Sequence, residues 1–573
     1  MNFTQIEFKT KLKKFSLILL VIATIFFFSP KTVSASSDYT YGWTKTIGND
    51  LSNNGGNFIG SDGLAVAHDS NNNIYTFGFF SGTFNFDPTG GMDSKTSHNN
   101  SNFGYDIFLT KTNADGSYAW TYTVGGTDRV DASSIDVDSN NNVYLSGSFL
   151  GTANFDPTGG IDNKTAVSES NGDVFLTKIN ANNSYGWTDV MNSADNNSWN
   201  VMPRITHDTA NNIYLTGSFF GTVNFDPTGG MDSKTTSGGA FLTKINANNS
   251  YGWTDIIADG NYSDYSVKVD TSGNIFWAGN FVDPVDFDPT SGVNNKECAN
   301  DGSGDVCMFL TKINSDNSYA WTDTTTNVDD GNYNKIGVKG LAIDSSNNIY
   351  LAGCFVRTIN FNFTGGGSAD TINGGYYTIF LTKINSDGSY GWTKTIFGGV
   401  HGVCADMVAL DSSQNIYISG QYCGTSDFDP GPGVDNHTDN ASGSTYLTQI
   451  KPDGSYGWTD VMVNTGVFGT GSANASRAIT IDTADNIYLT GFFIWGTVNF
   501  NTTGGVDNRT SVDAWGGYFL TKLSAPEITT PTPQPTPTPT PTTNNNNGLT
   551  ILPQTGANLL TGQLQSIFGL FLF

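Results

Sequence analysis

The sequence predicts an all-β chain folded as a seven-bladed β-propeller, with four antiparallel strands in each blade. One pattern recurs about every 70 residues, which is typical of propellers, solenoids and arrays. The repeat region shows no sustained 3.6-residue apolar periodicity, so we expect no helices there. A glycine marks each copy: Gly78, Gly147, Gly217, Gly279, Gly353, Gly420 and Gly491. A tryptophan recurs with the same period but is displaced by one element: Trp43, Trp120, Trp187, Trp253, Trp321, Trp392 and Trp458.

The displaced tryptophan predicts how the ring closes. Trp43 precedes the first glycine of the pattern, and no equivalent tryptophan follows the last third-strand segment, 519–522. A strand around Trp43 would therefore pair beside the strand around Phe519 and complete the last blade. Such closure leaves only short, protected strand edges. A β-helix is the alternative fold, but its rungs are much shorter than 70 residues and it does not explain the displaced strand.

Each copy contains the elements of one blade, and the fifth copy shows them clearly. Its four predicted strands are 341–344, 348–353, 378–384 and 390–396. The turn between the first two is Asp-Ser-Ser-Asn-Asn, and these residue types cap their own backbone and accept positive φ. The repeated tryptophans are expected to pack between blades. Four tryptophans outside the pattern are better candidates for stacking on a sugar: Trp199, Trp277, Trp495 and Trp515.

A second repeated block, Asn-Phe-Asp-Pro-Thr-Gly-Gly, leaves two interpretations open. As a turn, it uses the aspartate as a cap, the proline to fix φ and the glycines for the reversal. Alternatively, its carboxylate and nearby carbonyls could bind a hard cation such as Ca²⁺. No other cofactor is expected. The aspartates concerned are Asp87, Asp156, Asp226, Asp288 and Asp429.

The composition favours an extracellular protein and excludes some partners. Charged residues make up only 14% and aromatic residues 13%, and the chain contains 67 glycines. The formal net charge is −26. A basic surface for nucleic acid is therefore not expected, nor is adhesion to an anionic membrane.

Five cysteines leave at least one outside any intramolecular disulfide. Cys404 and Cys423 flank the turn at 411–415 almost symmetrically, so we expect them to face each other and pair. Cys298 and Cys307 lie in one loop and could close locally. Cys354 would then be the unpaired thiol. The spacings do not suit a structural zinc site.

Both ends of the chain predict export and display. Residues 1–35 read as a signal peptide, with lysines before an apolar run at 15–28 and a cleavage site between Ala35 and Ser36. An uncleaved membrane anchor is the alternative. The propeller is assigned to 36–524 and a disordered Pro/Thr-rich stalk to 525–550, since alternating proline favours an extended chain. The last segment, 551–573, carries a short motif and an apolar end.

Two resemblances extend this interpretation. Leu552-Pro553-Gln554-Thr555-Gly556 resembles the Leu-Pro-x-Thr-Gly motif that sortases read, although no basic residue follows the apolar tail. That resemblance implies cleavage after Thr555 and transfer to a cell-envelope amine. The segments 341–344, 348–353 and 379–383 resemble the SBBP-type bacterial β-propeller repeat, which covers nearly all of 40–524. That family implies the fold and an extracellular location, but no common activity.

No catalytic constellation stands out in the sequence. The five histidines are scattered, and His68 and His207 alone share a repeat position. The arginines Arg129, Arg204, Arg357, Arg477 and Arg509 fall in different blades. We therefore expect a monomeric, non-enzymatic propeller on the cell surface or cell wall that binds an extracellular protein or glycan. The alternative is a secreted carbohydrate-binding or carbohydrate-active propeller.

Overall fold

The computed structural model describes most of residues 38–526, and every regular element in this part of the chain is a β-strand. The predicted signal peptide 1–35, the Ala35–Ser36 pair and the motif Leu552–Gly556 lie outside the described residues. The chain divides into two units after Pro526, and the second, Glu527–Phe573, is likewise not described. Within the described ranges, no helix has the length and apolarity to cross a bilayer. Those ranges are 38–47, 60–98, 104–169, 172–194, 199–258, 263–282, 284–290, 292–298, 305–327, 335–363, 371–374, 377–398, 403–465, 473–511 and 516–526.

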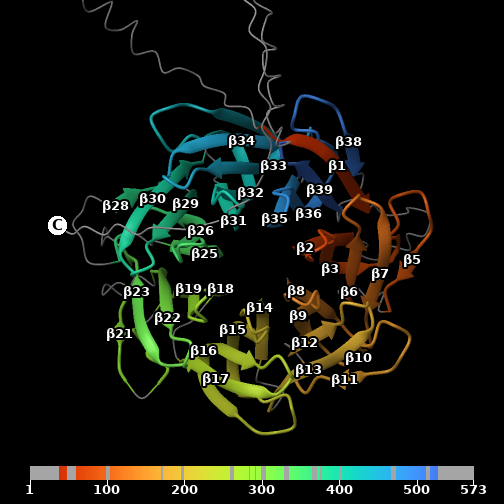
Figure 1. Cartoon of the computed structure of the whole chain (residues 1–573), viewed down its shortest axis with the longest axis vertical. Coiled ribbons are helices and arrows are strands. Elements are labelled where there is room, and N and C mark those ends of the chain that lie inside the picture. Colours follow the sequence, from red (N-terminus) through yellow and green to blue (C-terminus); the bar gives the residue numbers. More distant parts are fainter. Residues whose placement is uncertain are drawn as a thin grey trace, which may run out of the picture. The chain divides into compact units, whose positions relative to one another are not determined.

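The strands form propeller-like, four-stranded antiparallel groups placed about a common centre (Figure 1). Five groups are separate sheets, and two are joined into one eight-stranded sheet where β13 pairs with β15. The innermost strands are β2 (Gly60–His68), β8 (Val130–Val137), β14 (Trp199–His207), β18 (Ser263–Val269), β25 (Lys335–Ile343), β31 (Val403–Leu410) and β35 (Ala473–Ile481). Their neighbours are β3 (Ile74–Ser81), β9 (Val143–Phe149), β15 (Ile213–Asn224), β19 (Ile275–Phe281), β26 (Ile349–Val356), β32 (Ile416–Asp427) and β36 (Ile487–Ile494).

The outer half of each group continues this order. The third strands are β6 (Asp106–Thr112), β12 (Asp173–Ile179), β16 (Ser233–Ile245), β22 (Cys307–Ile313), β29 (Thr378–Ile384), β33 (Asn436–Ile450) and β39 (Gly517–Ser524). The fourth strands are β7 (Tyr118–Val124), β13 (Tyr185–Ser193), β17 (Tyr251–Ile257), β23 (Tyr319–Thr324), β30 (Tyr390–Phe397), β34 (Tyr456–Met462) and β1 (Thr40–Ile47).

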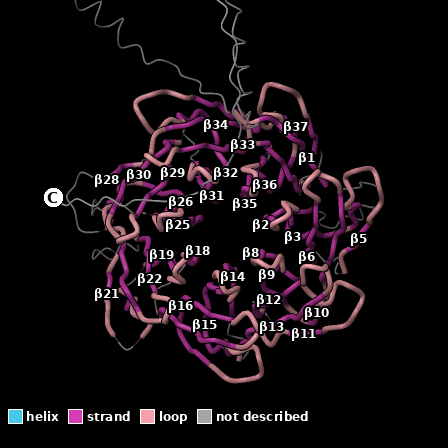
Figure 2. Tube along the Cα trace, in the orientation of Figure 1, coloured by secondary structure: helices cyan, strands magenta, loops and turns pink. Residues whose placement is uncertain are grey.

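Short peripheral strands, which the sequence did not predict, extend most groups (Figure 2). Except for β24, which pairs with β27, they flank the Asn-Phe-Asp-Pro-Thr-Gly-Gly block or its variants, so that block is the tip of a hairpin and not an isolated turn. In the β14 and β31 groups the hairpin is continuous with long second and third strands. The separate peripheral strands are β4 (Thr83–Asn85), β5 (Ser94–Thr96), β10 (Thr152–Asn154), β11 (Asn163–Thr165), β20 (Val285–Asp286), β21 (Asn295–Lys296), β24 (Thr326–Asn327), β27 (Thr358–Asn360), β28 (Thr371–Asn373), β37 (Gly496–Asn499) and β38 (Asn508–Ser511).

The repeated motif has a physical role in each group, as the β8 group shows. The Asp138 Oδ1 atom accepts hydrogen bonds from the backbone N–H groups of Asn140 and Asn142, at 2.9 and 2.8 Å, and so holds the turn after β8. The buried Tyr144 donates its hydroxyl hydrogen to Asp138 Oδ2, at 3.1 Å. The Trp187 ring packs on Tyr144 with the ring centres 6.1 Å apart. One aspartate therefore fixes both the turn and the aromatic core next to it.

The N-terminal strand β1 pairs with β39, at the other end of the described chain. The Trp43 ring lies 6.1 Å from the Tyr488 ring, as Trp187 does from Tyr144 in the β8 group. The first innermost strand, β2, in turn packs against β35, β36 and β39. Thr483 Oγ1 donates a hydrogen bond of 2.8 Å to Asn72 Oδ1, which joins the turn after β35 to the turn after β2.

Each innermost strand contains a β-bulge, a single extra residue with no partner opposite it. In β25, Val338 pairs with Gly353 and Gly340 with Ala352, so Lys339 is the extra residue. The corresponding residues are Leu64 in β2, Ser133 in β8, Asp406 in β31 and Arg477 in β35. Similar shifts occur in β14 and β18. Bulges of this kind bend a strand and re-aim a side chain.

The register of β31 against β32 shows that the predicted Cys404–Cys423 pairing is wrong. The shift at Asp406 moves the register by one residue, so Cys404 lies opposite Gln421. Cys404 instead forms a disulfide with Cys354 of β26, across two neighbouring groups. Cys354 is therefore not the unpaired thiol, and Cys423 lies outside both disulfides. A second disulfide joins Cys298 to Cys307.

Candidate functional site

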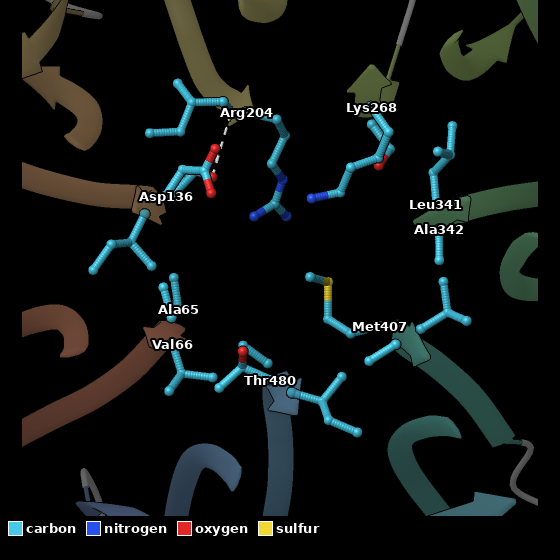
Figure 3. A pocket seen from close by; sticks show the side chains of 18 of the residues that line it. Ala65, Val66, Asp136, Arg204, Lys268, Leu341, Ala342, Met407 and Thr480 are labelled. Atoms are coloured by element: carbon cyan, nitrogen blue, oxygen red, sulfur yellow. Dashed lines mark hydrogen bonds between the residues drawn. The ribbon is translucent and has the colours of Figure 1, made fainter. Parts of the chain in front are cut away.

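The innermost strands line two adjoining cavities at the centre of the fold. The larger has a volume of about 560 Å³ and is lined by residues from β2, β8, β14, β18, β25, β31 and β35. The smaller has a volume of about 530 Å³. Leu64, Arg204 and Lys339 line both cavities, so the two meet at these side chains. Figure 3 looks into the larger cavity and shows Arg204 and Lys268 pointing toward its middle.

The smaller cavity gathers charged side chains from several groups, and we call it the charged cavity. Four of its lining residues are cationic and three are carboxylates, with Phe79, Ser133 and Ser148 among the others. The charged residues are Asp62, Arg129, Asp131, Arg204, Lys339, Asp406 and Arg477. The four cations come from four different repeats of the sequence. In a radial fold, however, equivalent positions of different repeats converge on the axis.

The bulges explain how these side chains reach the axis. Lys339, Asp406 and Arg477 are themselves bulged residues, and Arg204 directly follows the bulge in β14. A sequence signal for this arrangement exists, because all four stand four or five residues before the aspartate of the following turn. Aligning the repeats on that aspartate would have placed the four residues together.

Three of the four cations in the charged cavity have carboxylate partners. The Arg477 Nε atom lies 3.3 Å from Asp62 Oδ2. The Arg129 Nε atom lies 2.7 Å from Asp131 Oδ2. The Lys339 ammonium group donates to the carboxylate of Asp264, on β18. These pairs neutralise most of the local charge.

Arg204 and Asp406 remain outside these pairs. Among the described residues, the one hydrogen bond of the Arg204 guanidinium runs from Nη1 to the carbonyl oxygen of Ser133, at 3.2 Å. The Asp406 carboxylate makes no hydrogen bond and no ion pair within the described part of the chain. Burying a charge without a partner is costly. These two groups are therefore the ones available to a ligand.

Burial shifts the proton affinity of the carboxylates in this cavity. It raises the pKa of Asp406 to about 6, although the positive charges of Arg477, Lys339 and Arg204 act in the opposite direction. Burial also raises the pKa of Asp62 against the effect of its partner Arg477. Asp406 can therefore change protonation near pH 6 while facing a cavity. This is the property of a general acid or base.

The larger cavity carries a second, smaller polar set on one side of its wall. The Nδ1 atom of His207 lies 2.6 Å from Asp136 Oδ2, and that of His68 lies 2.9 Å from Thr480 Oγ1. Despite the opposing effect of burial, the Asp136 carboxylate raises the pKa of His207. His68 and His207, the two histidines that share a repeat position, thus both line the larger cavity. His401 lies outside the described residues.

The aspartates considered for Ca²⁺ act as turn caps in the structure. The Asp87 Oδ1 atom accepts from the backbone N–H of Thr89 at 2.8 Å and from its hydroxyl at 2.5 Å. A Cβ on Gly91 would lie 2.0 Å from Asp87 Oδ2, so the block needs glycine there. The described residues contain no group of three His, Cys, Asp or Glu side chains arranged to hold a metal. Matching caps occur at Asp156, Asp226, Asp288 and Asp429.

The tryptophans singled out for sugar stacking divide between core and surface. Trp277 is fully buried against Phe309, so its assignment as an exposed stacking residue is wrong. It lies on the central strand β19, where both faces are covered. Trp495 is 43% exposed and lies at the periphery, before β37. The side chains of Trp199 and Trp515 are outside the described residues.

Comparisons with known proteins place the chain in no named family. No family model matches it. An uncharacterised WD repeat-containing protein, L264 of Acanthamoeba polyphaga mimivirus, is 25% identical over 524 residues, or 78% of this chain and 36% of that protein. The chain therefore spans about a third of the length of this relative.

Similar solved structures include polysaccharide lyases and an endosialidase. An ulvan lyase of family PL25 has a TM-score of 0.39 at 10% identity, covering 84% of this chain and 98% of its own. The polysaccharide lyase Uly1 has a TM-score of 0.37 at 11% identity, covering 86% and 94%. The endosialidase of phage phi92 has a TM-score of 0.29 at 10% identity, covering 91% and 71%.

These similarities correct the prediction that the chain is not an enzyme. The similar structures are named as polysaccharide lyases and an endosialidase, against the expectation of a non-catalytic propeller, but they show no activity of this chain. With TM-scores below 0.4, no residue role carries over from them. Any catalytic assignment must come from the charged cavity itself.

Proposed function

We propose that this chain is an exported, closed seven-bladed β-propeller that binds and acts on a glycan in the charged cavity. The observation that carries the proposal is the pair of unmatched groups, Arg204 and Asp406, in a cavity of about 530 Å³. Asp406 supplies a proton-transfer group that titrates near pH 6. Arg204 supplies a fixed positive charge with hydrogen-bond donors to spare.

The lining of the cavity suits a sugar better than an apolar ligand. A sugar hydroxyl group both donates and accepts hydrogen bonds. Carboxylates accept from it and guanidinium groups donate to it, so this lining satisfies both functions. Phe79 adds an aromatic face among these polar groups. Glycosidic bonds are commonly cleaved by two carboxyl groups with different proton affinities. Asp62 and Asp406 are both present, and Asp62 is held by Arg477.

The closed, seven-bladed arrangement is supported by contacts between the first and last groups. Val66 and Ile74 pack with Ala478, Tyr488 and Leu520 in one apolar cluster. Such a cluster is what a continuous ring of blades requires. Closure also fixes the positions of all innermost strands about one axis, and the convergence of charges in the cavity depends on those positions.

Export and display complete the proposal. The segment 1–35 would direct the chain out of the cell, and the stalk at 525–550 would hold the propeller away from a surface. The motif Leu552–Gly556 would let a sortase link Thr555 to a cell-envelope amine. The resemblance to SBBP repeats fits this location. In this proposal the protein is a monomer that meets its glycan outside the cell.

The test combines binding with turnover on the mature chain. A glycan array would identify ligands, and a panel of lyase and hydrolase substrates would identify a reaction. Asp406→Asn should lower turnover by about 10²–10⁴-fold, the usual contribution of general acid–base catalysis. Asp316→Asn is the matched control, since Asp316 lies in an exposed turn. Absence of glycan binding and of turnover across the panels would contradict the proposal.

A further inference from the structure

The charge balance of the charged cavity differs from that of the whole chain. The formal net charge of the protein is −26, yet four of its 26 lysines and arginines line this one cavity beside three aspartates. Asp264 offsets Lys339 from outside this lining, so the four cations face four carboxylates in all. A chain with 52 acidic and 26 basic residues thus gathers cations at one place, which favours a ligand that carries negative charge.

The ion pairs show which cation is free to bind that charge. Arg477, Arg129 and Lys339 each have an aspartate partner. Arg204 has no carboxylate partner among the described residues and makes one hydrogen bond, to a carbonyl oxygen. A guanidinium group has five N–H donors and suits a two-point contact with a carboxylate or sulfate group. An anionic ligand would therefore supply the charged partner that Arg204 lacks among the described residues.

The position of Arg204 strengthens this argument. Its side chain points into the channel (Figure 3) and lines both cavities, so it stands where they meet. Burial lowers the pKa of Arg204, which reflects the removal of water from its charge. Low water content strengthens the attraction between opposite charges. A ligand anion at this place would be held more firmly than at an exposed arginine.

We propose that the charged cavity binds an anionic sugar, and that Arg204 is the main partner of its carboxylate or sulfate group. This inference rests on the proposed function and adds the class of substrate. Asp406 would then lie beside the bound sugar as the proton-transfer group. Its negative charge would oppose the ligand anion, so binding should be tightest when Asp406 is protonated.

The experiment measures affinity by calorimetry on the mature chain with three probes. They are an oligogalacturonate that carries carboxylates, a carrageenan oligosaccharide that carries sulfates, and a neutral maltooligosaccharide. We expect binding of at least one anionic probe and at least tenfold weaker binding of the neutral one. Affinity should fall as salt is raised from 50 to 500 mM, because salt screens such contacts. Which anionic probe binds distinguishes a carboxylate site from a sulfate site.

Variants then assign the contact to Arg204. Arg204→Gln should weaken the anionic probe about ten- to a hundredfold, the range expected for a charge-assisted hydrogen bond. Lys451→Gln is the matched control, because it removes one positive charge from an exposed turn and should change nothing. Arg204→Lys keeps the charge but loses the two-point geometry, so its affinity for the anionic probe should lie between those of wild type and Arg204→Gln. Melting temperatures establish that each variant is folded, and Arg204→Lys provides the test if Arg204→Gln is not.

The outcomes distinguish failure of this inference from failure of the proposed glycan function. Equal affinity for neutral and anionic probes would overturn the inference and leave a glycan-binding propeller in place. Anionic binding that Arg204→Gln and Arg204→Lys leave unchanged would overturn the role of Arg204. Failure of every glycan would overturn both. A loss of affinity between pH 5 and 7.5 that disappears in Asp406→Asn would support the role of Asp406.

Discussion

Replacing Asp189 by asparagine should stabilise the protein at neutral pH and have no such effect in acid. Asp189 lies on β13 with only 7% of its surface exposed, and its Oδ2 atom has no hydrogen-bond partner. Burial raises its pKa to about 6, although a hydrogen bond with Asn249 and the charge of Lys164 act in the opposite direction. In the unfolded chain the same carboxyl group has its ordinary pKa of 3.8.

The magnitude follows from these two pKa values. Between about pH 4 and pH 6 the folded state keeps a proton that the unfolded state has lost, so stability falls as the pH rises. Above about pH 6 the full cost of the ionised carboxylate is present. A shift of about two units corresponds to about 3 kcal/mol. An unfolding entropy of ~2.1 cal/mol/K per residue converts this into a change in Tm of about 3 °C for a unit of this size.

The assay is thermal unfolding of wild type and Asp189→Asn at pH 7.5 and at pH 3.5, which lies below both pKa values. We expect the variant to melt about 3 °C higher at pH 7.5 and near the wild-type temperature at pH 3.5. Asp316→Asn should change Tm little at either pH. Two sibling repeats already carry asparagine there, Asn182 and Asn248, with the same hydrogen bond from a serine hydroxyl. An equal gain at both pH values, or a loss at pH 7.5, would refute the reasoning.

Three further predictions concern the framework. Deleting 36–50 removes β1 with the buried Ile47, so Tm should fall by several degrees or the protein should aggregate. Deleting 526–550 should leave Tm unchanged, and equal effects would place the domain boundary elsewhere. A non-reduced digest should contain Cys354 linked to Cys404, whereas a Cys404–Cys423 peptide would contradict the register described for β31. In a host with a sortase, Thr555→Ala should move the protein from the wall fraction to the medium or membrane, and equal release of wild type would argue against anchoring.

The sequence predicted the repeated strands well because they depend on local chemistry. The turn after β25 forms where the Asp-Ser-Ser-Asn-Asn run predicted it, with Asn347 at φ 62°. The expected strand at 378–384 matches β29, and the strand at 341–344 corresponds to the end of β25. Positive φ and side-chain capping act within a few residues, so a single copy of the repeat suffices to identify them.

The candidate site could not be predicted from the same signals. Its residues come from six innermost strands, from β3 and β9, and from the segment before β8, so they are spread over most of the repeat region. The bulges that aim Lys339, Asp406 and Arg477 leave no mark in the hydrophobic pattern. The disulfide was mispredicted for a related reason, because Cys404 pairs with Cys354 of a neighbouring group, a contact that symmetry about one turn does not indicate.

The extra residue of each innermost strand makes the choice of an axial side chain independent of the pairing of the strand. Since it opposes no backbone partner, its side chain can be exchanged without disturbing the alignment of its neighbours. The molecule already shows this freedom, with Leu64, Ser133, Lys339, Asp406 and Arg477 at that place in different strands. Substitutions at a few of these axial positions could therefore change the ligand that binds while the fold stays the same. Relatives of this chain should therefore diverge first at the axis.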